Sequence, residues 1–274
     1  MNSLTRTEKI LIGGLAIAVT AILTTFIGLS WFNYPAADDF CFAAKARDLG
    51  FFEAQAFWYQ HWSGRYTLNA VWTALMTPAD MVTAYRFPPM ILLVLTWLGF
   101  SFLLDRMVQG QLGKSFSLLL GGLATVLFIA GIPDVAQTFY WQGGSITYQL
   151  ANVLLLFLTG LLVWRETTAT GRRWRTLLFW MSGLLVVAIV GANEISLLLM
   201  GSILCAGAGY ALWMRRDSRR FWLGLLAITL VAALISILAP GNYERYSGIE
   251  TDSMLRPTPW LAALLYLPWV VLRI

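Results

Sequence analysis

The chain has 274 residues, of which 58% are hydrophobic and only 12% are charged. A typical soluble domain is about 45–50% apolar and about 25% charged. The composition therefore excludes a soluble enzyme, a coiled coil, a collagen-like chain and a disordered chain, and it predicts an all-α polytopic membrane protein. The formal net charge of +5 does not indicate nucleic acid as a partner, because basic excess in membrane proteins usually lies in the cytoplasmic connections.

Long apolar runs predict a transmembrane helical bundle of about eight spans. A spanning helix needs about 20 mostly apolar residues, because the hydrocarbon core is about 30 Å thick. The predicted spans are residues 10–32, 87–104, 116–132, 146–164, 176–190, 195–213, 221–238 and 259–272. The apolar stretch 176–213 is too long for one span, and it predicts two short spans joined by a tight turn at residues 191–194. We treat residues 1–274 as one membrane domain.

Basic residues set the predicted orientation. With the N-terminus inside, every inside connection is basic, as the positive-inside rule requires. The inside segments then hold Arg6, Lys9, Arg106, Lys114, Arg165, Arg172, Arg173, Arg175, Arg215, Arg216, Arg219, Arg220 and Arg273. The sequence therefore predicts a multi-pass protein of the plasma (inner) membrane, with a cytoplasmic N-terminus.

The two ends of the chain carry two further expectations. The first apolar run is longer than the apolar region of a signal peptide, which favours an uncleaved signal anchor. The last run ends at Ile274 with almost nothing beyond it. That ending fits a complete chain and also fits the N-terminal part of a longer one.

The first outer segment, residues 33–85, is expected to lie in the membrane interface. Phe51, Ala54, Trp58 and Trp62 form an apolar helical stripe, which is typical of a helix that lies along the membrane surface. Residues 66–76 continue helically but are too short and too polar to span. His61, the only histidine, is interpreted as an interfacial polar residue rather than a base.

Polar residues suited to catalysis or ligand binding gather on the predicted outer face, whereas the spans contain almost no ionisable residues. Asp38 and Asp39 directly follow the first span. Two adjacent carboxylates suit a general base or a pair of ligands for a divalent metal ion, since like charges held close raise one pKa. Ordinary helix-capping aspartates in a solvated loop are the alternative.

Three further outer segments supply candidate binding residues. Trp141 and Tyr148 flank a Gly-Gly pair in the outer connection between the third and fourth predicted spans, where aromatic rings suit sugar faces. A belt tryptophan followed by a turn is the alternative. Arg65 has the guanidinium geometry that binds a phosphate or a carboxylate, although a snorkelling arginine fits equally well.

The other candidates lie in the turn between the fifth and sixth predicted spans and in the last outer connection. Asn193 and Glu194 occupy the apex of an apolar hairpin, where the carboxylate is expected to pair with an arginine or to bind a ligand. Asn242 belongs to an Ala-Pro-Gly-Asn stretch that is expected to end a helix in a turn. Arg245 follows three residues later and is expected to be held over the membrane surface.

In their order along the chain, these segments resemble the GT-C class of multi-spanning membrane glycosyltransferases, in particular its poorly characterised bacterial branch. The resemblance extends from the first span to about Arg245. It implies a transferase that moves a sugar from a polyprenyl-phosphate-linked donor to a glycan, lipid or protein acceptor on the non-cytoplasmic face.

The resemblance also implies a role for each candidate. Asp38 or Asp39 would be the catalytic base or a metal ligand, and Arg65 and Arg245 would neutralise phosphate charge. The sugar site would be lined by Trp141, Tyr148, Asn193, Glu194 and Asn242. Two alternatives remain open, namely a lipid or solute transporter and a non-catalytic membrane subunit of an envelope-assembly complex.

Overall fold

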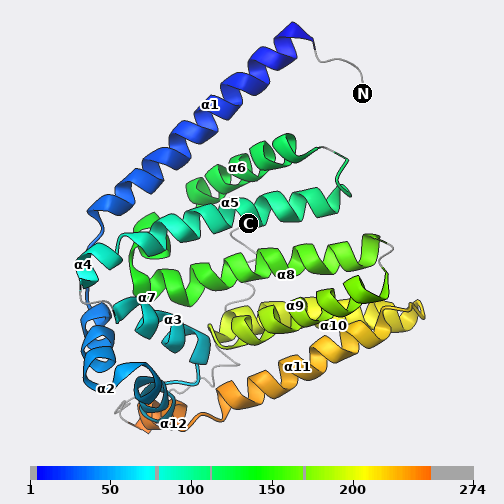
Figure 1. Ribbon diagram of the computed structural model, residues 1–274. Helices are drawn as coiled ribbons and strands as arrows, with labels where there is room; N and C mark the ends of the chain where they lie inside the picture. Colours follow the sequence, from blue (N-terminus) through cyan, green and yellow to red (C-terminus); the bar gives the residue numbers. More distant parts are fainter. Residues whose placement is uncertain (1–4, 78–79, 112, 169–170, 248–274) are drawn as a thin grey trace, which may run out of the picture.

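The computed structural model describes residues 5–77, 80–111, 113–168 and 171–247, and every regular element in these ranges is helical (Figure 1). The first half of the described chain contains α1 (Arg6–Leu29), η1 (Ser30–Phe32), α2 (Asp38–His61), α3 (Tyr66–Met76), α4 (Met81–Ala84), α5 (Phe87–Met107) and α6 (Lys114–Gly131). The second half contains η2 (Ala136–Tyr140), α7 (Gln142–Gly144), η3 (Ser145–Gln149), α8 (Leu150–Thr167), α9 (Arg172–Val190), α10 (Glu194–Trp213), α11 (Arg219–Ile237) and α12 (Pro240–Ser247). The all-α helical bundle is therefore confirmed.

Seven helical stretches among the described residues are long and apolar enough to cross a membrane, so the chain is a multi-pass membrane protein. They are Arg6–Phe32, Met81–Met107, Lys114–Gly131, Gln142–Thr167, Arg172–Val190, Glu194–Trp213 and Arg219–Ile237. They match the first seven predicted spans, including the hairpin at residues 191–194. The eighth predicted span, 259–272, lies outside the described residues.

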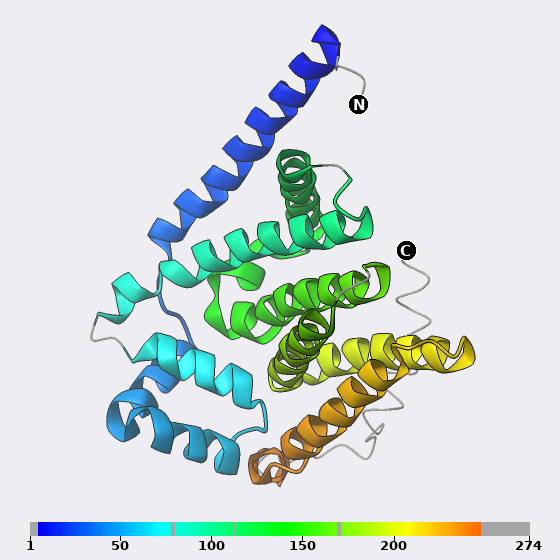
Figure 2. The ribbon, with the colours of Figure 1, turned by 45° about the vertical axis from the view of Figure 1, so that its right-hand side comes forward.

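The spans form a bundle in which consecutive helices are mostly neighbours (Figures 1 and 2). Helix α5 packs against both α6 and α8, α9 packs against α8 and α11, and α10 packs against α11. Neighbouring helices approach each other closely at glycines, which have no side chain. A β-carbon on Gly121 of α6 would lie 2.0 Å from the Ser101 hydroxyl of α5, and one on Gly160 of α8 would lie 2.5 Å from the Phe102 ring.

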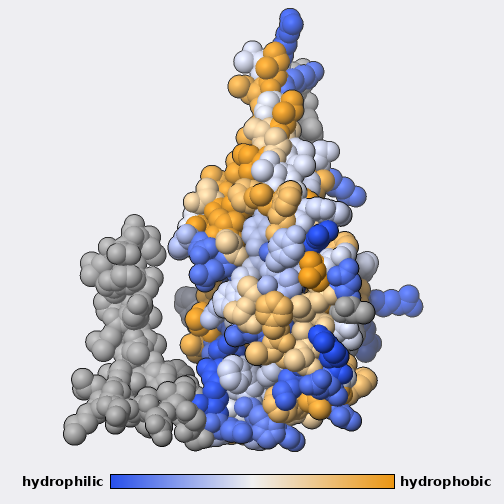
Figure 3. Space-filling model, turned by 90° about the vertical axis from the view of Figure 1, so that its left-hand side faces the viewer, coloured by the Kyte–Doolittle hydropathy of each residue, from blue (hydrophilic) through white to orange (hydrophobic). Residues whose placement is uncertain are grey.

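Helix α1 projects from one edge of the bundle, and little of its surface is buried by the protein (Figures 1 and 3). Exposed apolar side chains such as Ile10, Leu11 and Ile17 are more than 60% accessible. A large apolar surface of this kind is stable only against another apolar phase, here the lipid bilayer.

The two ends of the bundle differ in composition. The connections α5–α6, α8–α9 and α10–α11 lie at the end where the chain begins, and we call this the basic end because arginine or lysine occurs in each connection or at the helix ends that flank it. Helices α2, α3, α7 and α12 lie at the opposite end, which we call the α2 end (Figure 1). The arginines and lysines around these three connections, which the sequence assigns to one face, therefore do lie at one end of the bundle.

Helices α2 and α3 pack against each other at the α2 end rather than crossing the bundle. Helix α2 bends at Gly50, whose φ of +71° lies in a region that favours glycine. The predicted stripe is buried at Ala54 and Trp58, but Trp62 is 43% exposed because it lies at the C-terminal end of α2.

Three local predictions at the α2 end need correction. The outer connection between the third and fourth predicted spans is not a simple loop, because residues 136–149 form η2, α7 and η3, of which η2 and η3 are π-helical. Glu194 is not at the apex of the turn but begins α10, and Asn193 caps that helix by accepting a hydrogen bond from the Ser196 amide. The stretch beginning at Pro240 is the first turn of α12, where proline is well tolerated because that position has no helical N–H partner.

Candidate functional site

The adjacent carboxylates Asp38 and Asp39 have opposite environments. Asp38 is exposed, whereas Asp39 is fully buried. Asp39 Oδ2 accepts hydrogen bonds from the Tyr85 hydroxyl at 2.6 Å and the Ala36 amide at 2.8 Å, and Oδ1 accepts one from Trp72 Nε1 at 3.1 Å. Asp39 therefore ties the start of α2 to α3 and to the residue that follows α4.

Burial dominates the electrostatics of Asp39. Desolvation raises the pKa of the Asp39 carboxyl above its ordinary value, although the hydrogen bonds from Tyr85, Ala36 and Trp72 oppose the shift. The negative charge of Asp38 raises the pKa further, but it is the smallest of these contributions. The expected like-charge effect of an acidic pair is thus minor, because only one of the two side chains is removed from water.

Tyr85 joins Asp39 to the π-helical segment. Its hydroxyl donates to Asp39 and accepts from the Gln142 amide at 3.0 Å. The Asn33 side-chain amide donates to the Tyr85 carbonyl at 3.3 Å and to the Tyr140 carbonyl at 2.7 Å. The segments that follow the first span and precede α8 are therefore held together by buried polar contacts.

Asp38 lines a cavity of about 440 Å³ between the two halves of α2 and α3, which we call the α2 cavity. Its other ionisable lining groups are Cys41, Lys45 and His61. Its aromatic lining residues are Phe42, Phe57, Trp58, Trp62 and Trp72. Ligand sites are commonly cavities of this size with apolar walls and a few polar groups.

Stacked rings make the wall of the α2 cavity rigid. Phe42 lies between Trp58 and Trp72, with ring centroids 4.2 and 3.9 Å apart. Trp58 Nε1 is buried without a hydrogen-bond partner among the described residues. Lys45 Nζ lies 4.0 Å from the centroid of the Phe57 ring, a cation–π geometry that keeps a positive charge inside the cavity.

The backbone before Asp38 is strained. Ala37 has φ +50° and ψ −117°, a conformation that is costly for a residue with a β-carbon. The Ala36 amide that donates to Asp39 fixes this turn. The strain therefore accompanies the arrangement in which Asp39 points inward and Asp38 remains accessible.

Arg65 and Glu194 form the second part of the site. Arg65 Nε donates to Glu194 Oε1 at 3.0 Å, and Nη2 donates to Oε2 at 2.7 Å. The expected pairing of Glu194 with an arginine is confirmed. The carboxylate is 57% exposed rather than deeply buried, and Arg65 is 22% exposed.

Close backbone packing directs Arg65 towards Glu194. A β-carbon on Gly64 would lie 1.8 Å from the Ser236 carbonyl oxygen. Only glycine therefore fits at this position of the loop between α2 and α3. The Gly191 carbonyl accepts from the Thr67 and Leu68 amides at 2.9 and 3.1 Å. The turn before Glu194 thus satisfies donors at the start of α3, which otherwise have no helical partner.

The remaining residues of this turn act mainly through hydrogen bonds to the backbone. Asn193 is buried and donates to the Thr147 carbonyl at 2.5 Å. The Tyr66 hydroxyl donates to the Val187 carbonyl at 2.8 Å. Burial raises the pKa of Tyr66 to about 12, so this hydroxyl stays protonated at neutral pH.

Asn242 and Arg245 bring α12 into the same region. The Asn242 side chain accepts from the Gly64 amide at 3.1 Å and donates to the Ser236 and Ile237 carbonyls at 2.8 and 3.1 Å. Arg245 lies over the Trp62 ring, 5.4 Å from its centroid, and its charge also acts favourably on Glu194. Arg245 thus contacts a wall residue of the α2 cavity and is near enough to Glu194 for its charge to act on that carboxylate.

The two aromatic candidates differ in accessibility. Trp141 is partly buried, its ring limits the space around Gly143, and Nε1 is buried without a partner among the described residues. Tyr148 is 49% exposed. Neither side chain lines the α2 cavity.

The side chains that could bind a metal ion do not form a metal site among the described residues. No group of three or more histidine, cysteine, aspartate or glutamate side chains is close enough there to hold an ion. Both oxygens of Asp39 already accept hydrogen bonds from protein donors. The residues therefore do not fit the expected Asp38–Asp39 metal pair, and no step below depends on a metal.

Sequence reasoning missed several residues that build the site. Tyr85, Trp72 and Asn33 carry the buried contacts of Asp39 and its surroundings, and Lys45 contributes a charge to the cavity. Lys45 could have been found from the helix period, because it lies seven residues after Asp38 and so on the same helical face.

Comparisons of the chain with protein-family models, with curated proteins and with solved structures give no significant match.

Proposed function

We propose that the chain is a membrane glycosyltransferase that moves a sugar from a polyprenyl-phosphate-linked donor to a glycan, lipid or protein acceptor. The observation that carries the proposal is the exposed carboxylate of Asp38 on an aromatic-walled cavity that also contains Lys45. Aromatic faces bind sugar rings, and an accessible carboxylate can accept a proton from a hydroxyl group.

In this proposal Asp38 is the catalytic base. The acceptor hydroxyl oxygen forms a bond with the anomeric carbon of the donor sugar, and its proton passes to the Asp38 carboxylate. The bond between the anomeric carbon and the phosphate oxygen breaks, and the bonding electron pair leaves with the lipid phosphate. Asp39 is a positioning residue, because its buried hydrogen bonds fix the turn that presents Asp38.

Cationic side chains around the cavity would stabilise the phosphate that leaves. Lys45 lines the cavity, and Arg245 lies on Trp62, one of its wall residues. Arg65 does not line the α2 cavity, and its charge is balanced by Glu194, so the phosphate contact is assigned to Lys45 and Arg245. A preorganised positive charge favours a developing negative charge without further rearrangement.

The proposed location is the plasma (inner) membrane, with the basic end in the cytoplasm and the α2 end on the non-cytoplasmic face. Support comes from the arginines and lysines around the connections of the basic end, because such residues favour the cytoplasmic side. The lipid-linked donor would then reach the α2 cavity from the outer leaflet.

A transfer assay in proteoliposomes tests the proposal. Short-chain polyprenyl phosphate carrying a labelled hexose is supplied with candidate acceptors, and the release of polyprenyl phosphate is measured for a panel of sugars. Asp38→Asn is expected to lower the rate at least about a hundredfold, since general bases contribute about 10²–10⁴. Asp48→Asn, a change elsewhere on α2, serves as the control and should leave the rate unchanged.

Full transfer by the Asp38→Asn variant would overturn the assignment of the base. Translocation of the sugar lipid that is unaffected by Asp38→Asn, with no transfer to any acceptor, would instead support a transporter. An absence of both activities, together with co-purification of a membrane partner, would support a non-catalytic subunit.

A further inference from the structure

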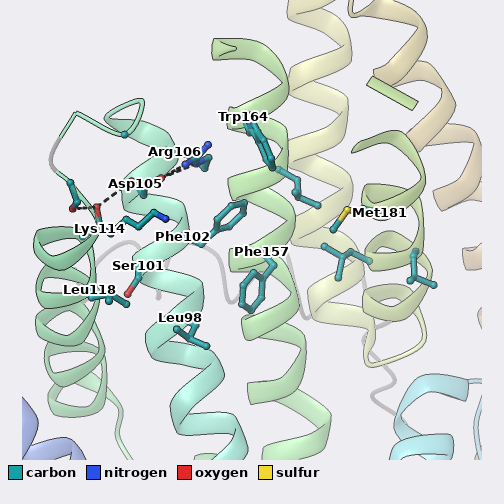
Figure 4. A pocket seen from close by; sticks show the side chains of 16 residues that line it. Leu98, Ser101, Phe102, Asp105, Arg106, Lys114, Leu118, Phe157, Trp164 and Met181 are labelled. Atoms are coloured by element: carbon teal, nitrogen blue, oxygen red, sulfur yellow. Dashed lines mark hydrogen bonds and ion pairs between the residues drawn. The ribbon is translucent and has the colours of Figure 1, made fainter. Parts of the chain in front are cut away.

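A larger cavity, of about 790 Å³, lies at the basic end, where Gly110 and Gly113 of the α5–α6 connection line it. Its floor is formed by α5 and α8, and its sides by α6 and α9 (Figure 4). We call it the basic-end groove. It is separate from the α2 cavity, and the inference below does not depend on the proposed transferase activity.

Most of the basic-end groove is apolar. Leu98 and Phe157 lie away from the charged residues, deep in the groove (Figure 4), and Leu161 and Leu184 also line it. Leu98 precedes Arg106 by eight residues, which corresponds to about 12 Å along a helix. One leaflet of the hydrocarbon core is about 15 Å thick, so the apolar part of the groove has the length of a lipid acyl chain within one leaflet.

The charged residues that line the groove all lie at its mouth, at the basic end. Arg106 forms an ion pair with Asp105, whose other oxygen lies 3.3 Å from the Ser117 hydroxyl. The Arg106 guanidinium lies over the Trp164 ring, 5.0 Å from its centroid. These contacts neutralise the charge of Arg106 and fix its position at the level of a membrane interface.

Lys114 supplies the uncompensated charge of this mouth. It begins α6 and reaches towards α5, near the Asp105–Arg106 pair (Figure 4). None of the ion pairs found in the described part of the chain includes Lys114. With one aspartate and two cations, the mouth has one net positive charge, which complements one phosphodiester group.

We propose that the basic-end groove binds one acidic phospholipid of the adjacent leaflet. Its phosphodiester contacts Lys114 and the free edge of Arg106, and one acyl chain lies along α5 and α8. A zwitterionic phospholipid fits the apolar part equally well but carries a cationic headgroup that the basic mouth repels. The groove therefore selects for net negative headgroup charge.

Native mass spectrometry of the purified full chain tests this inference. The protein is delipidated in detergent and titrated separately with phosphatidylglycerol and phosphatidylcholine that have identical acyl chains. We expect one tightly bound phosphatidylglycerol, with at least fivefold preference over phosphatidylcholine. Lys114→Gln should weaken phosphatidylglycerol binding about fivefold, the effect of one basic residue near an anionic lipid surface, and should not weaken phosphatidylcholine binding.

A second variant blocks the groove without touching its charges. Leu184 is 71% exposed and lines the groove from α9, so Leu184→Trp fills space there without disturbing the packed core. This change should weaken the binding of both lipids. Matched controls are Lys9→Gln, another exposed lysine, and Leu230→Trp, a 63% exposed leucine on α11 outside the groove. Both should bind as the wild type does, within twofold.

Three results would overturn the inference. Equal binding of the two lipids by the wild type would remove the charge selectivity. A Lys9→Gln effect as large as that of Lys114→Gln would assign the preference to general surface charge. Unchanged binding by Leu184→Trp would place the lipid outside the groove.

Discussion

Arg65 and Glu194 form a two-point ion pair, with Nε–Oε1 and Nη2–Oε2 distances of 3.0 and 2.7 Å, although 129 residues separate them in the sequence. The pair joins the start of α3 to the start of α10, next to the Gly191 carbonyl that accepts from the first turn of α3. The spans α9 and α10 and the packed helices α2 and α3 therefore have a fixed relation at this point.

A double-mutant cycle measures the strength of this pair. Arg65→Ala, Glu194→Ala and the double variant are compared by chemical unfolding in detergent micelles. The two-point geometry favours a strong interaction, but Glu194 is 57% exposed and so partly screened by solvent. We expect a coupling free energy of about 1 kcal/mol.

The Arg216–Glu166 pair at the basic end is the control for that cycle. Its single N–O distance is 3.4 Å, and we expect a coupling below about 0.5 kcal/mol. Equal couplings for the two pairs would show that the two-point geometry of Arg65 contributes nothing.

Asp39 is expected to be important for stability, whereas Asp38 is not. Asp39→Ala leaves the buried donors of Tyr85 and Trp72 without their acceptor, and unsatisfied buried groups cost about 1–3 kcal/mol each. We expect the free energy of unfolding to fall by about 3 kcal/mol. Asp38→Ala, at an exposed position, should change it by less than about 0.5 kcal/mol. Similar losses for both variants would contradict the different environments of the two carboxylates.

The buried Asp39 also predicts a dependence of stability on pH. Burial raises its pKa in the folded protein, so the folded state binds the proton more tightly than the unfolded state does. The resulting stabilisation is fully present below the ordinary pKa of 3.8 and is lost as the pH rises through the folded pKa. The measurement is the difference in unfolding free energy between the wild type and Asp39→Asn across the acidic range. A difference that grows with pH would mean that the hydrogen bonds outweigh burial and lower the pKa.

The sequence was sufficient for the spans but not for the site. Apolar runs of about 20 residues are local signals, so seven spans were located to within a few residues, and the hairpin before α10 followed from the length of one run. Asp38 and Asp39 look equivalent in the sequence, since nothing local shows that Tyr85, 46 residues away, donates to only one of them. The helical start at Pro240 was also missed, because proline and glycine mark both turns and first helical positions.

Native cysteines test the proposed orientation. Both Cys41 and Cys205 are free and exposed in the protein. Cys41 lines the α2 cavity, whereas Cys205 belongs to the span Glu194–Trp213 and faces lipid there. A membrane-impermeant maleimide added to intact cells should label Cys41 alone, and Cys41→Ala should abolish labelling. Labelling of Cys41 only in inside-out vesicles would reverse the orientation.

Gly64 is expected to tolerate no side chain, because the loop between α2 and α3 lies directly on the end of α11. A β-carbon there would lie 1.8 Å from the Ser236 carbonyl oxygen and 2.8 Å from the Ala239 β-carbon. Backbone cannot move aside as a flexible side chain can, so Gly64→Ala should lower the unfolding free energy by about 2–3 kcal/mol. Gly201→Ala on α10 is the control, since its β-carbon would meet nothing within 4 Å, and alanine favours the helix by up to about 1 kcal/mol. Arg65 follows Gly64 directly, so the displaced loop should also weaken the Arg65–Glu194 coupling. A stable Gly64→Ala variant with an undiminished coupling would show that the α2–α3 loop does not depend on its contact with α11.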